Sequence, residues 1–195
     1  PADIISHILE VYFSRETDFY LNDRLCEALL KTAMHFGRIA VEEPQNYVAR
    51  ANLMWTSSLA INDLISYGKG CAWSCHPMEH ELSAYYDITH GAGLAILTPH
   101  WMRHVLNTRT VEKFRTYGVN VWDVPADLPS MEAAELAIKR TADYFKALGL
   151  PSRLSEVGID EKYLEIMAEK SASRMKGTYV ELTKDEILQI FKEAM

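Results

Sequence analysis

The segment Asp3–Tyr12, with the sequence DIISHILEVY, carries the pattern that decides the fold. Its apolar residues recur at positions 4, 8 and 11, with a second apolar residue beside each, and this spacing lines one face of an α-helix. Similar spacing returns at Leu25, Leu29 and Thr32, and again along Val48–Asn62. The periodicity therefore predicts that helices make up most of the chain.

Glycine and proline residues mark where the predicted helices stop. Boundaries are expected at Gly37, Pro44, Gly68–Gly70, Pro99, Pro125, Pro129 and Gly149–Pro151. A helix that opens at Pro129 should end at Gly149, where a C-cap glycine belongs, and Thr183 with Glu186 forms a capping box before the final helix. The sequence shows no alternating strand pattern and no βαβ unit. We therefore predict one all-α domain of about eight helices over residues 1–195.

Composition excludes several classes of protein. The 195 residues carry a formal net charge of -7, so no basic excess exists to displace counterions from nucleic acid. The apolar run Gly91–Pro99 is too short to span a bilayer, which argues against a membrane protein. Three cysteines, Cys26, Cys71 and Cys75, match no disulfide framework and favour a reducing cytoplasm; we expect buried thiols rather than a thiolate metal site. The first residue, Pro1, begins no signal peptide, and we expect a cut end there.

Two clusters of residues could bind a metal ion. Asp3 and His7 are four apart, so their side chains share one helix face, although an isolated surface pair would have the same spacing. The second cluster lies at residues 76–91, where His76, His80 and His90 supply three of the seven histidines. These three could instead be buried structural histidines. The zinc-protease motif is excluded because Pro77 stands where that motif requires its general base, glutamate.

Two motifs in the second cluster carry a resemblance to a known family. HxxxHELS at residues 76–83, followed by HGxGLA at residues 90–95, resembles the C-terminal signature of the iron-containing (group III) alcohol dehydrogenases, in particular the butanol dehydrogenase and aldehyde reductase branch. The segments EPQNYVARANLMW at 43–55 and ALGLPS at 147–152 resemble further parts of that family. The resemblance covers essentially the whole chain. It implies a dehydroquinate synthase-like helical domain.

The resemblance also implies a set of functional residues. In the family, an aspartate and a histidine four apart, a third histidine, and a fourth histidine fourteen residues later bind the metal. Asp3, His7, His76 and His90 match these positions, and the expected ion is Fe(II) or Zn(II). His80 matches a further histidine that lies near nicotinamide and substrate, so it is the expected catalytic and cofactor-binding residue. A core histidine is the competing interpretation of His80.

The expected activity follows from the same resemblance. The chain corresponds to the metal-binding half of an NAD(P)-dependent alcohol dehydrogenase or aldehyde reductase that acts on a small alcohol or aldehyde, and the whole enzyme is expected to form a homodimer. NAD(H) or NADP(H) would be held mainly by an N-terminal Rossmann-like domain, which is absent from this chain, so the chain alone should be inactive. Two alternatives stay open: a free-standing helical metal-binding or interaction domain without catalysis, and a metal-dependent hydrolase.

Overall fold

The computed structural model describes residues 1–16 and 18–195, and within them the chain forms nine α-helices and two short 3-10 helices without a β-strand. The prediction of an all-α fold is confirmed, with one helix more than the approximate count expected. The helices are α1 (Ala2–Tyr12), α2 (Tyr20–Glu42), α3 (Tyr47–Ile61), α4 (Cys75–Tyr86), α5 (His90–Val105), α6 (Val111–Trp122), α7 (Ser130–Ala147), α8 (Leu164–Ala172) and α9 (Lys184–Glu193), with the 3-10 helices η1 (Leu154–Val157) and η2 (Glu161–Tyr163) before α8.

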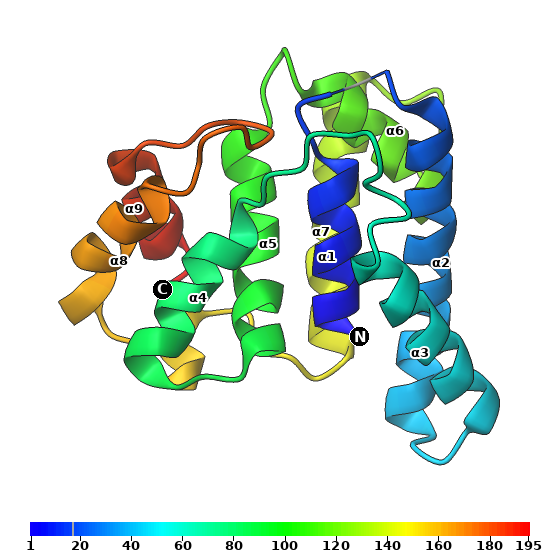
Figure 1. The fold of residues 1–195 in the computed structure, drawn as a ribbon, viewed down its shortest axis with the longest axis horizontal. Helices are drawn as coiled ribbons and strands as arrows, with labels where there is room; N and C mark the ends of the chain where they lie inside the picture. Colours follow the sequence, from blue (N-terminus) through cyan, green and yellow to red (C-terminus); the bar gives the residue numbers. More distant parts are fainter. Residues whose placement is uncertain (17) are drawn as a thin grey trace.

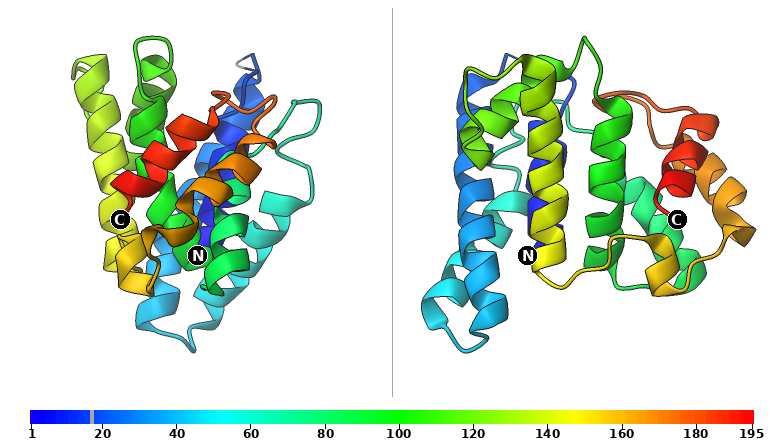
Figure 2. Two further views of the ribbon diagram at one scale, coloured as in Figure 1. Left: turned by 90° about the vertical axis from the view of Figure 1, so that its left-hand side faces the viewer. Right: turned by 180° about the vertical axis from the view of Figure 1, so that it is seen from behind.

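Helix α1 lies near the centre of the domain. Figure 1 shows α1, α5 and α7 in the middle, with α2 and α3 on one side and α8 and α9 on the other, and the view from behind in Figure 2 repeats this order. Helix α4 runs beside α5 on the side of α8. The N-terminal helix therefore sits between the two sides of the domain.

The apolar face of α1 explains its central place. Ile5, Ile8, Leu9 and Tyr12 are buried in the core, as their helical spacing predicts. Burying a side chain of this size contributes about 1.5–3 kcal/mol. The core is one connected cluster that includes residues from every α-helix in the described chain. Packing therefore fixes which residues of α1 face the neighbouring helices.

Two predicted helix boundaries are wrong. Gly37 lies inside α2. A Cβ at this position would stand 2.6 Å from the Tyr144 hydroxyl oxygen and 3.0 Å from Cβ of Pro1, so the glycine allows close packing and does not end the helix. Pro99 lies inside α5. The flanking side chains Leu97 and Trp101 are fully buried there, and their burial offsets the backbone hydrogen bond that proline cannot make.

The predicted helix caps are confirmed. Helix α7 begins directly after Pro129, and Gly149 follows its end with a φ of 78°, in the left-handed region where glycine is favoured. At the start of α9, the side chain of Thr183 accepts from the backbone of Glu186 and the Glu186 side chain accepts in return. None of the helices in the described residues has an apolar stretch long enough to cross a bilayer.

Candidate metal centre

Three helices bring the predicted ligands together. Helix α1 carries Asp3 and His7 on successive turns, α4 carries His76 in its first turn, and α5 begins at His90. Between α4 and α5 the chain turns at Asp87, whose φ of 52° is left-handed and ends α4. This tight turn returns the start of α5 toward α1, so residues far apart in the sequence face one region.

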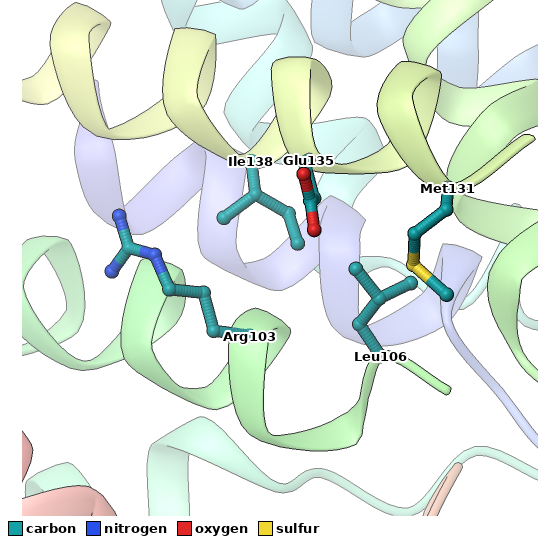
Figure 3. A pocket seen from close by; sticks show the side chains of 5 residues that line it. All are labelled: Arg103, Leu106, Met131, Glu135 and Ile138. Atoms are coloured by element: carbon teal, nitrogen blue, oxygen red, sulfur yellow. The ribbon is translucent and has the colours of Figure 1, made fainter. Parts of the chain in front are cut away.

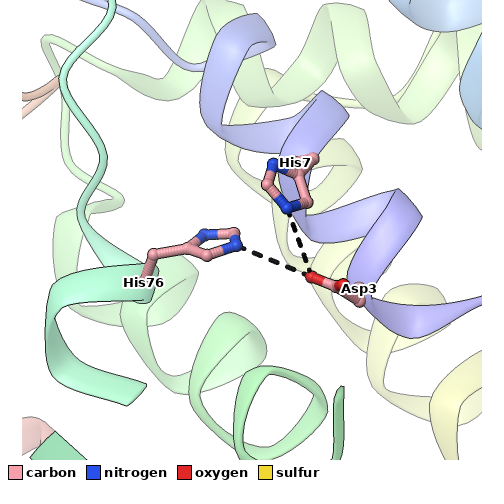
Figure 4. A group of neighbouring side chains, drawn as sticks. All are labelled: Asp3, His7 and His76. Carbon is pink, nitrogen blue, oxygen red and sulfur yellow. Dashed lines mark ion pairs between the residues drawn. The ribbon is translucent and has the colours of Figure 1, made fainter. Parts of the chain in front are cut away.

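The donor atoms converge on Asp3. Its Oδ1 lies 3.4 Å from Nε2 of His7, 3.6 Å from Nε2 of His76 and 3.6 Å from Nε2 of His90. In Figure 4 the rings of His7 and His76 both point toward the Asp3 carboxylate. The separations from His76 and His90 exceed a normal hydrogen bond but suit atoms that share one ion. The four residues predicted as ligands are therefore neighbours in space.

The donor set fits a divalent ion of the first transition row. Asp3 Oδ1 and His76 Nε2 are buried and lack a hydrogen-bond partner among the described residues, as does Nδ1 of His7. Buried polar atoms without partners are costly, and an ion beside Asp3 Oδ1 and His76 Nε2 would satisfy both atoms. Three imidazole nitrogens and one carboxylate oxygen are ligands that Fe(II) and Zn(II) accept. A group of Asp3, His7 and His76 satisfies the spacing of a metal site on distance alone.

The local charges alter the pKa values of these groups. Burial lowers the pKa of His76, but its interactions with the carboxylates of Asp3 and Glu10 outweigh burial and raise the pKa to about 9. Interaction with the His76 ring lowers the pKa of Asp3. Burial and the neighbouring His76 lower the pKa of His7. A metal ion and a proton compete for Nε2 of His76, because a ligating imidazole must be neutral.

Two buried carboxylates beside the site were not predicted from the sequence. Glu10 on α1 contacts Nδ1 of His76 at 3.1 Å, and Glu79 on α4 contacts Nδ1 of His90. Glu10 interrupts an apolar run and lies three residues after His7, on the same helix face, which is the signal that could have found it. Glu79 lies three residues after His76 in the same way, but no apolar run surrounds it, so the sequence does not show that it is buried.

His80 lies at the edge of the site. Its ring centroid is 5.9 Å from that of His76 and 5.5 Å from that of His90, and its side chain is exposed. The part of the His80 ring that is shielded from water lowers the pKa of this histidine. Ligand atoms of Glu79, His80 and His90 also lie close enough together to hold an ion. The structure therefore groups His80 with the site but not among the residues around Asp3.

Other chemical features lie outside this cluster. The cysteine side chains are free thiols in the described chain, and burial raises the pKa of Cys26 to about 12 and that of Cys75 well above its ordinary value. A pocket of about 420 Å³ between α5 and α7 is lined by five residues shown in Figure 3. Its lining, from Arg103 to Ile138, includes none of the candidate ligands. The region around Asp3 is therefore the candidate site.

The sequence of this chain is similar to those of known proteins over nearly its whole length. The family described as Fe-containing alcohol dehydrogenase, C-terminal, matches residues 2–195. NADH-dependent butanol dehydrogenase B from Clostridium acetobutylicum is 57% identical over 198 residues, covering 100% of this chain and 51% of that protein. NADPH-dependent aldehyde reductase YqhD from Escherichia coli is 33% identical over 169 residues, covering 87% of this chain and 43% of that protein.

Solved structures agree with the sequence comparison. The aldehyde reductase YqhD from E. coli, free of substrate and cofactor, superposes with a TM-score of 0.90 at 30% identity, covering 100% of this chain and 51% of that one. A butanol dehydrogenase A from Thermotoga maritima gives a TM-score of 0.89 at 31% identity, covering 99% and 50%. The chain spans about half the length of the curated relatives it matches.

Proposed function

The chain belongs to the Fe-containing alcohol dehydrogenase family, and on that basis we propose that it is the metal-binding half of an NAD(P)-dependent alcohol dehydrogenase or aldehyde reductase. The observation that carries the proposal is the convergence of Asp3, His7, His76 and His90, with the buried atoms Asp3 Oδ1 and His76 Nε2 left without hydrogen-bond partners in the described structure. These four side chains would hold one divalent ion, Fe(II) or Zn(II).

The ion would supply Lewis-acid polarisation of the oxygen of a small alcohol or aldehyde. The protein residues have separate tasks around it. Asp3 contributes negative charge, and the three imidazoles contribute neutral nitrogen donors from α1, α4 and α5. Their origin on three packed helices fixes the backbone positions of the four residues, because moving any one of them requires moving a packed helix.

His80 is proposed to act on the substrate side. It is exposed, stacks against the His90 ring with an interplanar angle of 25°, and lies away from Asp3. Its lowered pKa favours the neutral ring near pH 7, which can accept or pass on a proton. We assign His80 to proton relay or positioning beside substrate and nicotinamide, rather than to the metal.

The nicotinamide cofactor is proposed to bind mainly to the half of the enzyme that this chain does not include. The relatives that are 57% and 53% identical are named as NADH-dependent, whereas the aldehyde reductase at 33% identity is named as NADPH-dependent. This pattern favours NADH. We further propose that the complete enzyme is a homodimer that acts on small molecules.

Elemental analysis of a protein that carries both halves, together with a panel of alcohols and aldehydes offered with both cofactors, tests the proposal. One Fe or Zn per chain and chelator-sensitive turnover are expected. Turnover that persists without any ion would contradict it. The 195-residue chain alone should show little dehydrogenase activity, and robust turnover by it with NAD(P)H would refute the assignment of the cofactor to the other half.

The role of His80 has its own test. In a protein that carries both halves, His80→Ala should leave the ion in place while turnover falls by about 10²–10⁴-fold, the range for loss of a general acid or base. Metal content and kcat measured on the same preparation give the answer. Loss of the ion in this variant would make His80 a ligand instead.

A further inference from the structure

We propose that Glu10 and Glu79 are positioning residues that fix the proton and the orientation of His76 and His90, so that Nε2 of each ring faces the metal. The inference rests on the proposed metal site. Glu10 on α1 and Glu79 on α4 are buried carboxylates outside the set of four proposed ligands. Each carboxylate contacts Nδ1 of one ligand histidine, on the side of the ring opposite the site.

Glu10 holds both the ring and the backbone of His76. Its Oε2 lies 3.1 Å from Nδ1 of His76, and its Oε1 accepts from the backbone N–H of His76 at 3.2 Å and from that of Cys75. Ser74, the N-cap residue of α4, makes no side-chain cap bond in the described structure, so Glu10 caps α4 from α1. One carboxylate therefore ties the start of α4 to the helix that carries Asp3 and His7.

Glu79 holds the ring of His90 in a corresponding way. It is completely buried, contacts Nδ1 of His90, and accepts from Oγ of Ser83 at 2.6 Å. Gly93 on α5 leaves room for it, since a Cβ at that position would stand 2.7 Å from Cγ of Glu79. The Gly-x-Gly sequence after His90 thus has a packing reason at its second glycine.

The chemistry of these contacts selects one tautomer. An ionised carboxylate only accepts hydrogen bonds, so the shared proton must lie on Nδ1 of each histidine. A neutral ring then has its lone pair on Nε2, which in both residues is the atom 3.6 Å from Asp3 Oδ1. Metal-ligating histidines commonly donate their other N–H to a carboxylate, which orients the ring and raises its basicity.

The charge balance supports the same conclusion. Every ion pair of Asp3, Glu10 and Glu79 in the described chain is with a histidine rather than with lysine or arginine. When those rings are neutral, three carboxylates face the cluster without a fixed positive charge. Glu10 and Glu79 are buried, whereas the Asp3 side chain is 46% exposed. Buried charges require a partner, and a divalent ion bound by His76 and His90 supplies one.

The two carboxylates differ in what a glutamine replacement would do. In Glu10→Gln, the amide oxygen is needed by the backbone N–H groups of residues 75 and 76, so the amide nitrogen must face Nδ1 of His76 and donate to it. That reversal places the ring proton on Nε2 and blocks the metal. In Glu79→Gln, the hydroxyl of Ser83 can turn toward the carbonyl of Ile88, 3.3 Å away, so the amide oxygen can still accept from His90.

Zn(II) affinity, measured by competition with a chelator, tests this difference on the purified chain. The affinity should fall about 100-fold in Glu10→Gln and about tenfold in Glu79→Gln, within the range for outer partners of metal ligands. Glu81→Gln is the matched control: Glu81 is also a buried carboxylate on α4, but it pairs with Lys170 and Arg174 and touches no ligand histidine. The Zn(II) affinity of the Glu81→Gln variant should match that of the unaltered chain. Equal Zn(II) affinities in all three variants would overturn the proposal.

A second measurement needs no variant and so does not depend on how well one folds. Nitrogen-15 spectra of the histidine rings in the Zn(II)-loaded chain should show His76 and His90 bound through Nε2, with a proton on Nδ1. Coordination through Nδ1 of either ring, or two ions per chain with Nδ1 of His90 as a ligand, would refute the inference while leaving metal binding intact. A chain that binds no Zn(II) or Fe(II) would instead refute the proposed function, and this inference with it.

Discussion

Two clusters of charged side chains lie in different parts of the domain and differ in how their buried polar atoms are satisfied. In the first, which we call the Asp23 cluster, Asp23 Oδ1 pairs with Lys69 at 3.2 Å and Oδ2 pairs with Lys113 at 2.5 Å. In the metal centre, by contrast, Asp3 Oδ1 and His76 Nε2 have no hydrogen-bond partner in the described residues. The charges of the Asp23 cluster therefore satisfy one another, whereas the candidate metal centre keeps buried atoms that an ion would satisfy.

The surroundings of the two clusters strengthen the contrast. Beside Asp23, the carboxylate of Glu27 accepts from Tyr12 at 2.9 Å and from Asn120 at 3.0 Å. Beside Asp3, the carboxylates of Glu10 and Glu79 contact Nδ1 of His76 and His90, the nitrogen of each ring that lies away from Asp3. Burial and charge alone therefore do not identify a functional site. The useful criterion is which buried atoms keep an unused lone pair.

The largest expected effect comes from removing a ligand. His90→Ala deletes one of the four donors, so the purified chain should lose stoichiometric metal altogether. Elemental analysis after extensive dialysis measures this directly. One tightly bound ion per chain in the variant would end the assignment of His90 as a ligand and weaken the contrast between the clusters.

The second effect separates stability from metal binding. Lys69→Met removes a buried partner of Asp23, and the free energy of unfolding should fall by about 3 kcal/mol, because a carboxylate loses one of its two buried cations. Zn(II) content should stay at one ion per chain. Urea unfolding and metal analysis of the same sample check both parts. Loss of the ion without loss of stability would show that the Asp23 cluster serves the site.

The third effect is a pH dependence confined to the metal centre. Burial opposes protonation of His76, but Asp3 and Glu10 raise its pKa to about 9, so below that pH a proton must leave before Nε2 can bind the ion. Apparent Zn(II) affinity should therefore fall about tenfold for each unit by which the pH is lowered from 9 to 7. Chelator competition at several pH values gives the slope. A flat profile over this range would contradict the role of His76.

The smallest effect is expected at Ser83, which contacts Glu79 and not a ligand histidine. Ser83→Ala removes the hydroxyl that donates to Glu79 at 2.6 Å, while the contact between Glu79 and His90 remains. Zn(II) affinity should fall by less than about tenfold, below the effect of altering a carboxylate itself. A loss larger than that of Glu79→Gln would mean that Ser83, and not Glu79, sets the position of His90.

Much of this could be predicted from the sequence, for identifiable reasons. Helical periodicity is repeated over the whole chain, and the caps at Gly149 and Thr183 depend on a few adjacent residues. The ligand set is predicted from the spacing of its two clusters and a family resemblance. The structure then brings Asp3, His7, His76 and His90 to one place, although their role as ligands remains a prediction.

What could not be predicted depends on contacts between distant segments. Gly37 and Pro99 look like helix breakers in sequence, yet packing keeps both inside helices. Glu10 caps a helix that starts 65 residues later, and Glu79 is buried by α5. Neither fact follows from local spacing, because each depends on where one helix end meets another.

Anomalous diffraction from crystals of the Zn(II)-loaded chain locates the ion and so distinguishes the two possible sets of ligands. We expect one ion bound by a carboxylate oxygen of Asp3 and by Nε2 of His7, His76 and His90, at distances of about 2.0–2.2 Å. An ion held instead by Glu79, His80 and His90 would contradict it.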